Sequence, residues 1–105
     1  MKFKRLFSGT DGKSHFEDLN PAHFSELHPA EGVLFRNNPP DQSSQWHNAP
    51  RRRFLITLSG SLDVTVGDGT VVTFAPGDVF LAEDLTGQGH TIHPKDNWTR
   101  AIIEL

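Results

Sequence analysis

The stretch FLITLSGSLDVTVGDGTVVTFAPGDVFLAE, residues 54–83, decides the fold class of this chain. Three turn signals, Gly60-Ser61, Asp68-Gly69 and Pro76-Gly77, divide it at intervals of about eight to ten residues. Asp-Gly favours a tight hairpin because both residues tolerate positive φ, and Pro-Gly suits the centre of a type II turn. Short runs rich in Val, Ile, Thr and Phe between such turns are typical of a β-sandwich or β-barrel.

The strands that we expect lie between and beyond these turns. Leu62, Val64 and Val66 alternate with polar residues, which is the pattern of a strand with one face in water. The predicted strands of the second half are Phe54–Ser59, Leu62–Val66, Thr70–Phe74, Val79–Glu83 and Thr99–Leu105.

The first third of the chain is less regular. We expect residues 1–32 to form an irregular arm and residues 33–105 the barrel core, all within one domain of 105 residues. Arg5–Phe7 and Val33–Arg36 are candidate strands, and Asp18–Leu27 is a candidate helical turn with a helix-start signal at Asn20-Pro21.

Composition excludes several classes of protein. The chain has no cysteine, so disulfides, iron–sulfur clusters and thiolate chemistry are ruled out. The net charge of −3 does not favour nucleic acid as a partner. No segment approaches the roughly 20 apolar residues that cross a membrane, and the start MKFKRLF does not resemble a signal peptide. We therefore expect a cytoplasmic protein with neither a nucleic-acid nor a membrane partner.

Residues 46–90 carry two spaced motifs, with His47 and Gly60 in the first and Gly77 and His90 in the second. This arrangement resembles the cupin superfamily, whose members are small antiparallel barrels of the jelly-roll type. In cupins the first motif has two histidines one residue apart, a glutamate, and a glycine after six more residues. The second has a glycine, a proline six residues on, and a histidine further along. The whole sequence is similar to small single-domain bacterial and fungal cupins without an assigned activity.

The departures from the cupin pattern concern its metal ligands. Ala49 stands at the second histidine position, Arg53 at the glutamate position and Glu83 at the motif proline. Two of the usual four ligands are therefore missing, and the resemblance implies a degenerate metal site.

A divalent ion such as Zn, Fe, Mn or Ni would have His47 and His90 as ligands, with Glu83 or Asp84 as a third. Arg53 opposes this alternative, because its guanidinium stays protonated and would repel a cation in a barrel interior. We favour a metal-free pocket, although the metal site stays open at this point.

An anion pocket is the other interpretation of the same residues. The cupin register turns Arg53 inward, and a guanidinium is suited to a carboxylate or phosphate. In the alternative, Arg53 forms an internal ion pair with Glu83 or Asp84 and binds nothing. The predicted ligand-binding residues are Trp46, Arg51, Arg53, Leu55 and Thr57.

Acid–base chemistry is a further possibility, with His47, His90 and Glu83 as candidate catalytic residues. Glu83 and Asp84 are neighbours and face opposite sides of a strand, so only one can line the pocket. The motif position favours Glu83, and Asp84 is expected to bind backbone groups of the Thr86–Gly89 loop. The same alternation separates Arg52 from Arg51 and Arg53, so the three arginines form no single basic patch.

Three functional classes follow. The first is a small-molecule-binding cupin with an anionic, carboxylate-type ligand. The second is a metal-dependent cupin enzyme of the dioxygenase or isomerase type, and the third is a metal-free acid–base isomerase or lyase. We also expect a homodimer, because apolar strand faces such as Phe54, Ile56 and Leu58 need to be covered.

Overall fold

The computed structural model describes residues 1–20, 22 and 25–105. Within these residues the chain forms nine strands and no α-helix. The strands are β1 (Phe3–Ser8), β2 (Ser14–Asp18), β3 (Gly32–Asn38), β4 (Arg53–Ser59), β5 (Leu62–Val66), β6 (Val71–Phe74), β7 (Val79–Glu83), β8 (His90–Pro94) and β9 (Trp98–Glu104). The predicted all-β class is confirmed.

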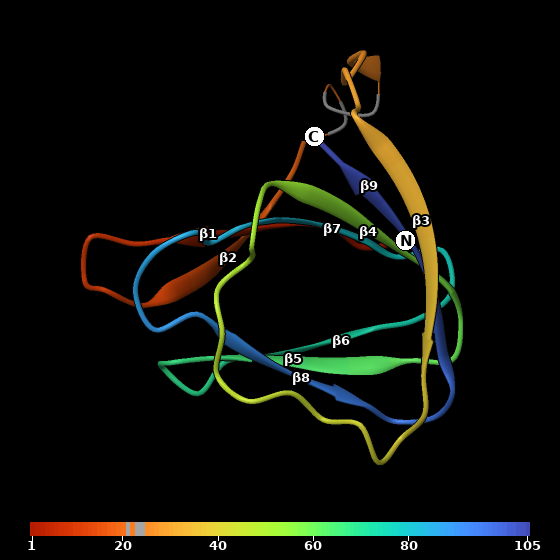
Figure 1. Ribbon diagram of the computed structural model, residues 1–105. Coiled ribbons are helices and arrows are strands. Elements are labelled where there is room, and N and C mark those ends of the chain that lie inside the picture. The colour runs from red at the N-terminus through yellow and green to blue at the C-terminus, as the bar shows by residue number, and fades with distance from the viewer. Residues whose placement is uncertain (21, 23–24) are drawn as a thin grey trace.

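The strands are arranged in two sheets that face each other (Figure 1). The larger sheet has the order β2-β1-β7-β4-β9-β3, and the smaller has the order β6-β5-β8. The sheets do not close into a complete barrel, so the expected barrel is an open, jelly-roll-like sandwich. Most pairs are antiparallel as predicted, but β1 runs parallel to β7.

The hydrophobic core lies between the two sheets. Leu62 and Phe74 from the smaller sheet and Leu6, Phe80 and Trp98 from the larger one are all almost completely buried. The rings of Phe74 and Phe80 lie 4.6 Å apart between centroids and join the two layers. Burial of each such side chain stabilises the fold by about 1.5–3 kcal/mol, which is why the apolar faces of the two sheets meet.

The N-terminal residues are more regular than expected. The arm predicted over residues 1–32 contains β1 and β2, which form one end of the larger sheet. The candidate strand Arg5–Phe7 lies within β1 and carries the apolar pair Leu6 and Phe7. Ser14–Asp18 is mostly polar and gains its strand conformation by pairing with β1. These residues are more regular than local composition indicated, because β2 forms a hairpin with β1 and β1 in turn pairs with β7.

One further strand was not predicted. The residues of β8, HTIHP, are mostly polar, and they form a strand because they pair along the full length of β5. The predicted strands Thr70–Phe74 and Thr99–Leu105 are confirmed with ends shifted by one residue.

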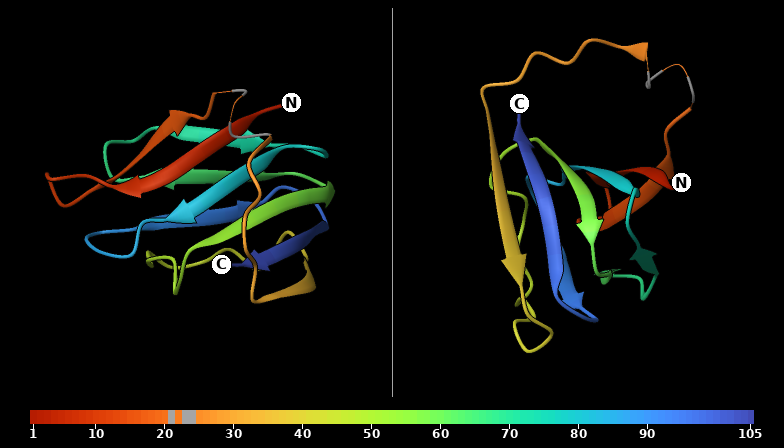
Figure 2. Two further views of the ribbon diagram at one scale, coloured as in Figure 1. Left: turned by 90° about the horizontal axis from the view of Figure 1, so that it is seen from above. Right: turned by 90° about the vertical axis from the view of Figure 1, so that its right-hand side faces the viewer.

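The connection from β2 to β3 passes from one edge of the larger sheet to the other (Figure 2). One of its described residues, His28, packs on the outer face of that sheet. The ring of His28 meets the ring of Phe54 edge-on at 4.8 Å, and Phe3 stacks against Phe54 at 6.1 Å. Phe54 is thereby buried within the chain itself.

Part of the expected helical turn over residues 18–27 falls on Pro21, His23 and Phe24, which lie outside the described residues. The described part includes a hydrogen bond from the Ala22 N–H to the side-chain oxygen of Asn20, at 2.9 Å. Among the residues that the structure describes, no helix is long and apolar enough to span a membrane.

Candidate functional site

A small cavity lies between the sheets and brings together several of the predicted site residues. Its volume is about 40 Å³. It is bounded by β4, β7 and β8 and by the segment that precedes β4. The lining residues are His47, Ala49, Pro50, Arg53, Leu55, Phe80, Ala82, His90 and Ile92.

His47 and His90 are joined by backbone hydrogen bonds, and their imidazole rings lie close together. The His47 N–H donates to the His90 carbonyl at 3.1 Å, and the His90 N–H donates back to His47 at 2.9 Å. Gly89 makes this approach possible, because a Cβ there would collide with the His47 carbonyl and its φ is +78°. The imidazole rings are consequently held 4.5 Å apart between centroids, at an interplanar angle of 54°.

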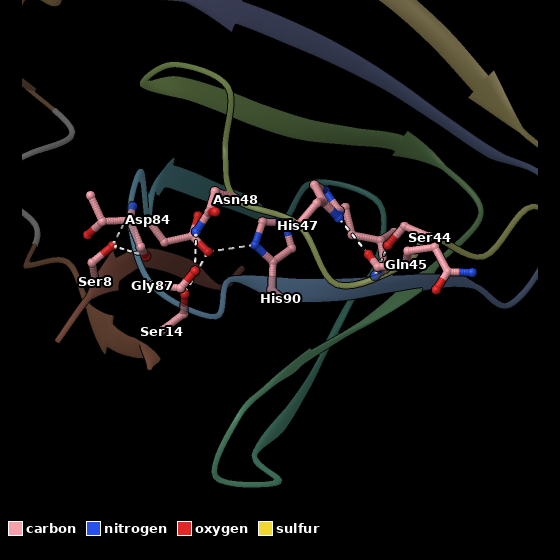
Figure 3. A network of polar contacts seen from close by, with 11 residues as sticks. Ser8, Ser14, Ser44, Gln45, His47, Asn48, Asp84, Gly87 and His90 are labelled. Carbon is pink, nitrogen blue, oxygen red and sulfur yellow. Dashed lines mark hydrogen bonds and ion pairs between the residues drawn. The ribbon is translucent and has the colours of Figure 1, made fainter. Parts of the chain in front are cut away.

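Each imidazole is oriented by an acceptor at its Nδ1 atom (Figure 3). His90 Nδ1 lies 2.7 Å from Asp84 Oδ2, and His47 Nδ1 lies 2.8 Å from the Gln45 carbonyl oxygen. A carboxylate and a carbonyl only accept hydrogen bonds, so both Nδ1 atoms carry a proton. In the neutral rings the Nε2 atoms are then unprotonated and available as acceptors, bases or ligands.

Asp84 is the buried acid of the site. Its side chain is fully buried, and Oδ2 also accepts a hydrogen bond from Ser14 Oγ at 2.7 Å. The other oxygen, Oδ1, has no hydrogen-bond partner among the described residues. The expectation that Asp84 binds the Thr86–Gly89 loop is wrong. That loop is held by Asn48, whose amide donates to the Gly87 carbonyl at 3.1 Å.

Glu83 faces the opposite side of the sheet, so its predicted place in the pocket is wrong. Ala82 and Phe80 face the core, and the pleat therefore turns Glu83 outward and Asp84 inward. Glu83 accepts hydrogen bonds from Arg5 and from Arg52, the latter at 2.8 Å. Burial acts to raise the pKa of Glu83, but these two guanidinium groups outweigh it, so the pKa lies below its usual value.

A larger hollow of about 540 Å³ lies on this outer face, beside Glu83. Its arginines are engaged by acids of the same hollow, with Arg5 bound to both Glu83 and Glu17. The arginines of this hollow are therefore already engaged in ion pairs.

Arg53 reaches the cavity but pairs with an acid that the sequence did not indicate. Its Nη2 lies 2.6 Å from Glu104 Oε1, on the neighbouring strand β9. Arg51 contacts the same carboxylate and also Glu31, whereas Arg52 faces the other side of the sheet. The predicted separation of Arg52 from its neighbours is confirmed, and the predicted pairing of Arg53 with Glu83 or Asp84 is wrong. Arg53 Nε is buried and has no acceptor among the described residues.

Of the other predicted ligand-binding residues Leu55, Trp46 and Thr57, only Leu55 lines the cavity. Leu55 lines it, as expected. Trp46 is 45% exposed beside His47 and is not part of the lining. Thr57 is buried, and its hydroxyl accepts a hydrogen bond from Trp98 Nε1 at 3.1 Å, so it serves the core.

Comparison with known proteins agrees with this architecture. No protein-family model and no curated protein matches the chain. Solved structures do match. A cupin-2 domain containing protein from Shewanella frigidimarina is 15% identical over 96% of this chain and 78% of its own, with a TM-score of 0.54. A cupin superfamily protein from Desulfitobacterium hafniense is 18% identical over 85% of this chain and 90% of its own, also with a TM-score of 0.54. The chain has the cupin fold.

A third matching structure, from Neisseria meningitidis, is 20% identical over 76% of this chain and 80% of its own, with a TM-score of 0.56. At these identities the likeness concerns the fold alone. The chemistry of this chain must therefore be argued from its own cavity.

The donor set of the cavity does not fit a divalent metal well. His47 and His90 present two Nε2 atoms, but Ala49 offers no ligand and Glu83 faces away. Among residues 1–20, 22 and 25–105, no three histidine, aspartate or glutamate side chains are grouped so as to hold an ion. The guanidinium of Arg53 lines the same space and would repel a cation.

Proposed function

We propose that this chain is a small-molecule-binding cupin whose cavity holds the carboxylate group of a small ligand. The observation that carries the proposal is the convergence of Arg53, His47 and His90 on one cavity between the sheets. A mostly apolar space with a few convergent polar groups is the usual form of a small-molecule site.

The polar groups of the cavity include both hydrogen-bond donors and hydrogen-bond acceptors. The buried Arg53 N–H at Nε lacks an acceptor, and a ligand carboxylate supplies one. Glu104 already neutralises much of the charge of Arg53, so the ligand bond is mainly a directed hydrogen bond. The two imidazole Nε2 atoms accept hydrogen bonds, which favours a ligand with a hydroxyl beside its carboxylate. The volume of about 40 Å³ suits such a head group rather than a large molecule.

The experiment is a titration with acetate and with a small 2-hydroxy acid, followed by NMR of the histidine and arginine side chains. We expect saturable shifts of the signals of His47 and His90. Arg53→Gln should weaken binding by about tenfold or more, since it removes the hydrogen-bond donor. The matched control is Arg52→Gln, which removes an equal charge from the outer face and should leave binding unchanged. Equal affinities for the two variants would contradict the proposal.

A second candidate function, metal-free acid–base catalysis, is favoured by the Asp84–His90 pair. A buried carboxylate at Nδ1 fixes the tautomer and the orientation of the ring, which leaves Nε2 as the atom that can accept a proton from a ligand. Proton abstraction beside a bound carboxylate would transfer the proton to His90 Nε2 and leave the electron pair on the ligand. Return of the proton from His90 Nε2 to a different atom of the ligand would complete an isomerisation.

Hydrogen exchange tests this second function. Small 2-keto and 2-hydroxy acids are incubated with the protein in deuterium oxide, and loss of the carbon-bound proton is followed by NMR. Exchange should fall by about tenfold or more in His90→Gln, and partly in Asp84→Asn, which keeps a hydrogen-bond acceptor. Exchange no faster than with His90→Gln would reject the catalytic role and leave the binding role standing.

A further inference from the structure

Two arginines lie directly opposite each other on the inner face of the larger sheet. Arg36 of β3 and Arg100 of β9 are cross-strand partners in the antiparallel register. Leu34 and Ile102, the next pair on the same face, pack into the core, which identifies the face as the inner one. Like charges in directly opposed positions destabilise a sheet unless a counter-charge lies between them.

Arg100 is held in place without a carboxylate. Its Nη1 donates to Asn38 Oδ1 at 2.7 Å, and its guanidinium lies 4.0 Å above the ring of Trp98. Its Nε is buried and has no acceptor among the described residues. Two contacts thus fix the plane of the guanidinium, while part of its hydrogen-bonding capacity stays unused.

Arg36 is exposed, and its side chain makes no hydrogen bond or ion pair with any of the described residues. The acid on this face of β9 is Glu104, and it is already bound by Arg53 and Arg51. No described carboxylate therefore compensates the Arg36–Arg100 pair.

The electrostatics agree with this geometry. Burial, and then the positive charges of Arg36 and Arg53, lower the pKa of Arg100 to about 10. Burial and the neighbouring positive charges both destabilise the protonated form of Arg100. A bound anion would offset both effects, because it supplies hydrogen bonds and a compensating negative charge.

We propose that the Arg36–Arg100 pair is a binding site for a tetrahedral oxyanion of the phosphate class, separate from the carboxylate cavity. Two guanidinium forks match the several oxygens and the double charge of a phosphate group better than those of one carboxylate. Asn38 accepts from Arg100 through its oxygen, which leaves its amide nitrogen to donate to the same anion. Because β3 is an edge strand of the larger sheet, the anion approaches from the sheet edge, where the exposed Arg36 forms the outer half of the site.

The test is a titration with inorganic phosphate at about pH 8, where the dianion dominates, at constant ionic strength adjusted with sodium chloride. The arginine Nε–Hε signals and the histidine ring signals are followed by NMR. We expect saturable shifts of the Arg100 and Arg36 signals, with those of His47 and His90 unmoved. A linear response equal to that of chloride alone would overturn the proposal.

Variants locate the site. Arg36→Gln and Arg100→Lys should each weaken phosphate binding by about tenfold. The first removes a guanidinium group, and the second replaces a guanidinium group, which can donate two parallel hydrogen bonds, with an ammonium group, which cannot. Arg52→Gln is the control of equal charge and should bind phosphate normally. Arg36→Gln should also fold at least as well as the parent, since it removes an uncompensated like charge. Retention of full phosphate affinity by Arg36→Gln would refute the site.

This site and the proposed function can fail separately. Acetate that moves the histidine signals while phosphate moves nothing would keep the carboxylate cavity and reject the oxyanion site. Phosphate that binds at Arg36 and Arg100 while small carboxylates bind nowhere would do the reverse.

Discussion

Replacement of Asp84 by alanine should be among the most destabilising single changes in this protein. The carboxylate is fully buried and accepts two hydrogen bonds of 2.7 Å, from Ser14 Oγ and His90 Nδ1. Both donors are themselves buried. Asp84→Ala leaves these donors without an acceptor, in a place that water reaches poorly.

The magnitude follows from those two donors. An unsatisfied buried donor costs about 1–3 kcal/mol, so two cost about 2–6 kcal/mol. Removal of the buried carboxylate returns part of its own desolvation cost. We therefore expect a loss of about 2–4 kcal/mol, against a total stability of about 5–15 kcal/mol for a domain of this size. Asp84→Asn keeps one acceptor and the side-chain volume, so it should lose about 1–2 kcal/mol.

The assay is equilibrium unfolding in urea. With a slope of about 1–1.5 kcal/mol per molar, a loss of about 2–4 kcal/mol in Asp84→Ala lowers the midpoint by about 1.3–4 M, and a loss of about 1–2 kcal/mol in Asp84→Asn lowers it by about 0.7–2 M. Ser14→Ala should lose about 1–2 kcal/mol, and the Ser14→Ala/Asp84→Ala double variant less than the sum of the single losses. The control is Asp96→Ala, at an exposed position in the loop before β9, which should change stability by no more than about 0.5 kcal/mol. Asp84→Ala with a midpoint like that of Asp96→Ala, or Asp84→Asn less stable than Asp84→Ala, would refute the reasoning.

Further predictions concern the loop before β8, the outer face and the assembly. Gly89→Ala should destabilise the protein and loosen the His47–His90 pair, because a Cβ at position 89 collides with the His47 carbonyl. We expect broadened histidine NMR signals and a lower urea midpoint. Unchanged spectra would contradict this prediction. The pKa of Glu83 is lowered in the folded protein from 4.5, so its contribution to stability is complete above about pH 4.5 and is lost as pH falls through the folded value. Thermal unfolding of Glu83→Gln should therefore depend less on pH in the acid range than that of the parent, and identical pH profiles would reject this assignment. The homodimer expected from apolar strand faces stays a prediction; Phe35 and Val33 on the edge strand β3 are 68% and 58% exposed, and light scattering at micromolar concentration should give twice the chain mass.

Alternation along single strands was a sound guide wherever one face is wet. It predicted β5, with Leu62, Val64 and Val66 inside, and it placed Arg52 opposite its two neighbours. It failed in β7, where Val79 to Ala82 are apolar without interruption because both faces of this central strand are covered. An uninterrupted apolar run does not indicate which residues face inward. The prediction therefore relied on the cupin motif position, which placed the wrong acid, Glu83, in the cavity.

The chain by itself determined the all-β class and most strand positions. These follow from local physics, since turn chemistry and a period of two act over a few residues. The convergence of His47, His90 and Arg53 was predicted from the cupin resemblance rather than from any local pattern. Only the tertiary structure decided the partners: Asp84 for His90, Glu104 for Arg53, and Arg36 for Arg100. Ser14 and Asp84 are 70 positions apart in the chain, and nothing near either residue indicates the other. Such pairs depend on which strands become neighbours, and that is set by burial of apolar surface throughout the molecule rather than by any local pattern.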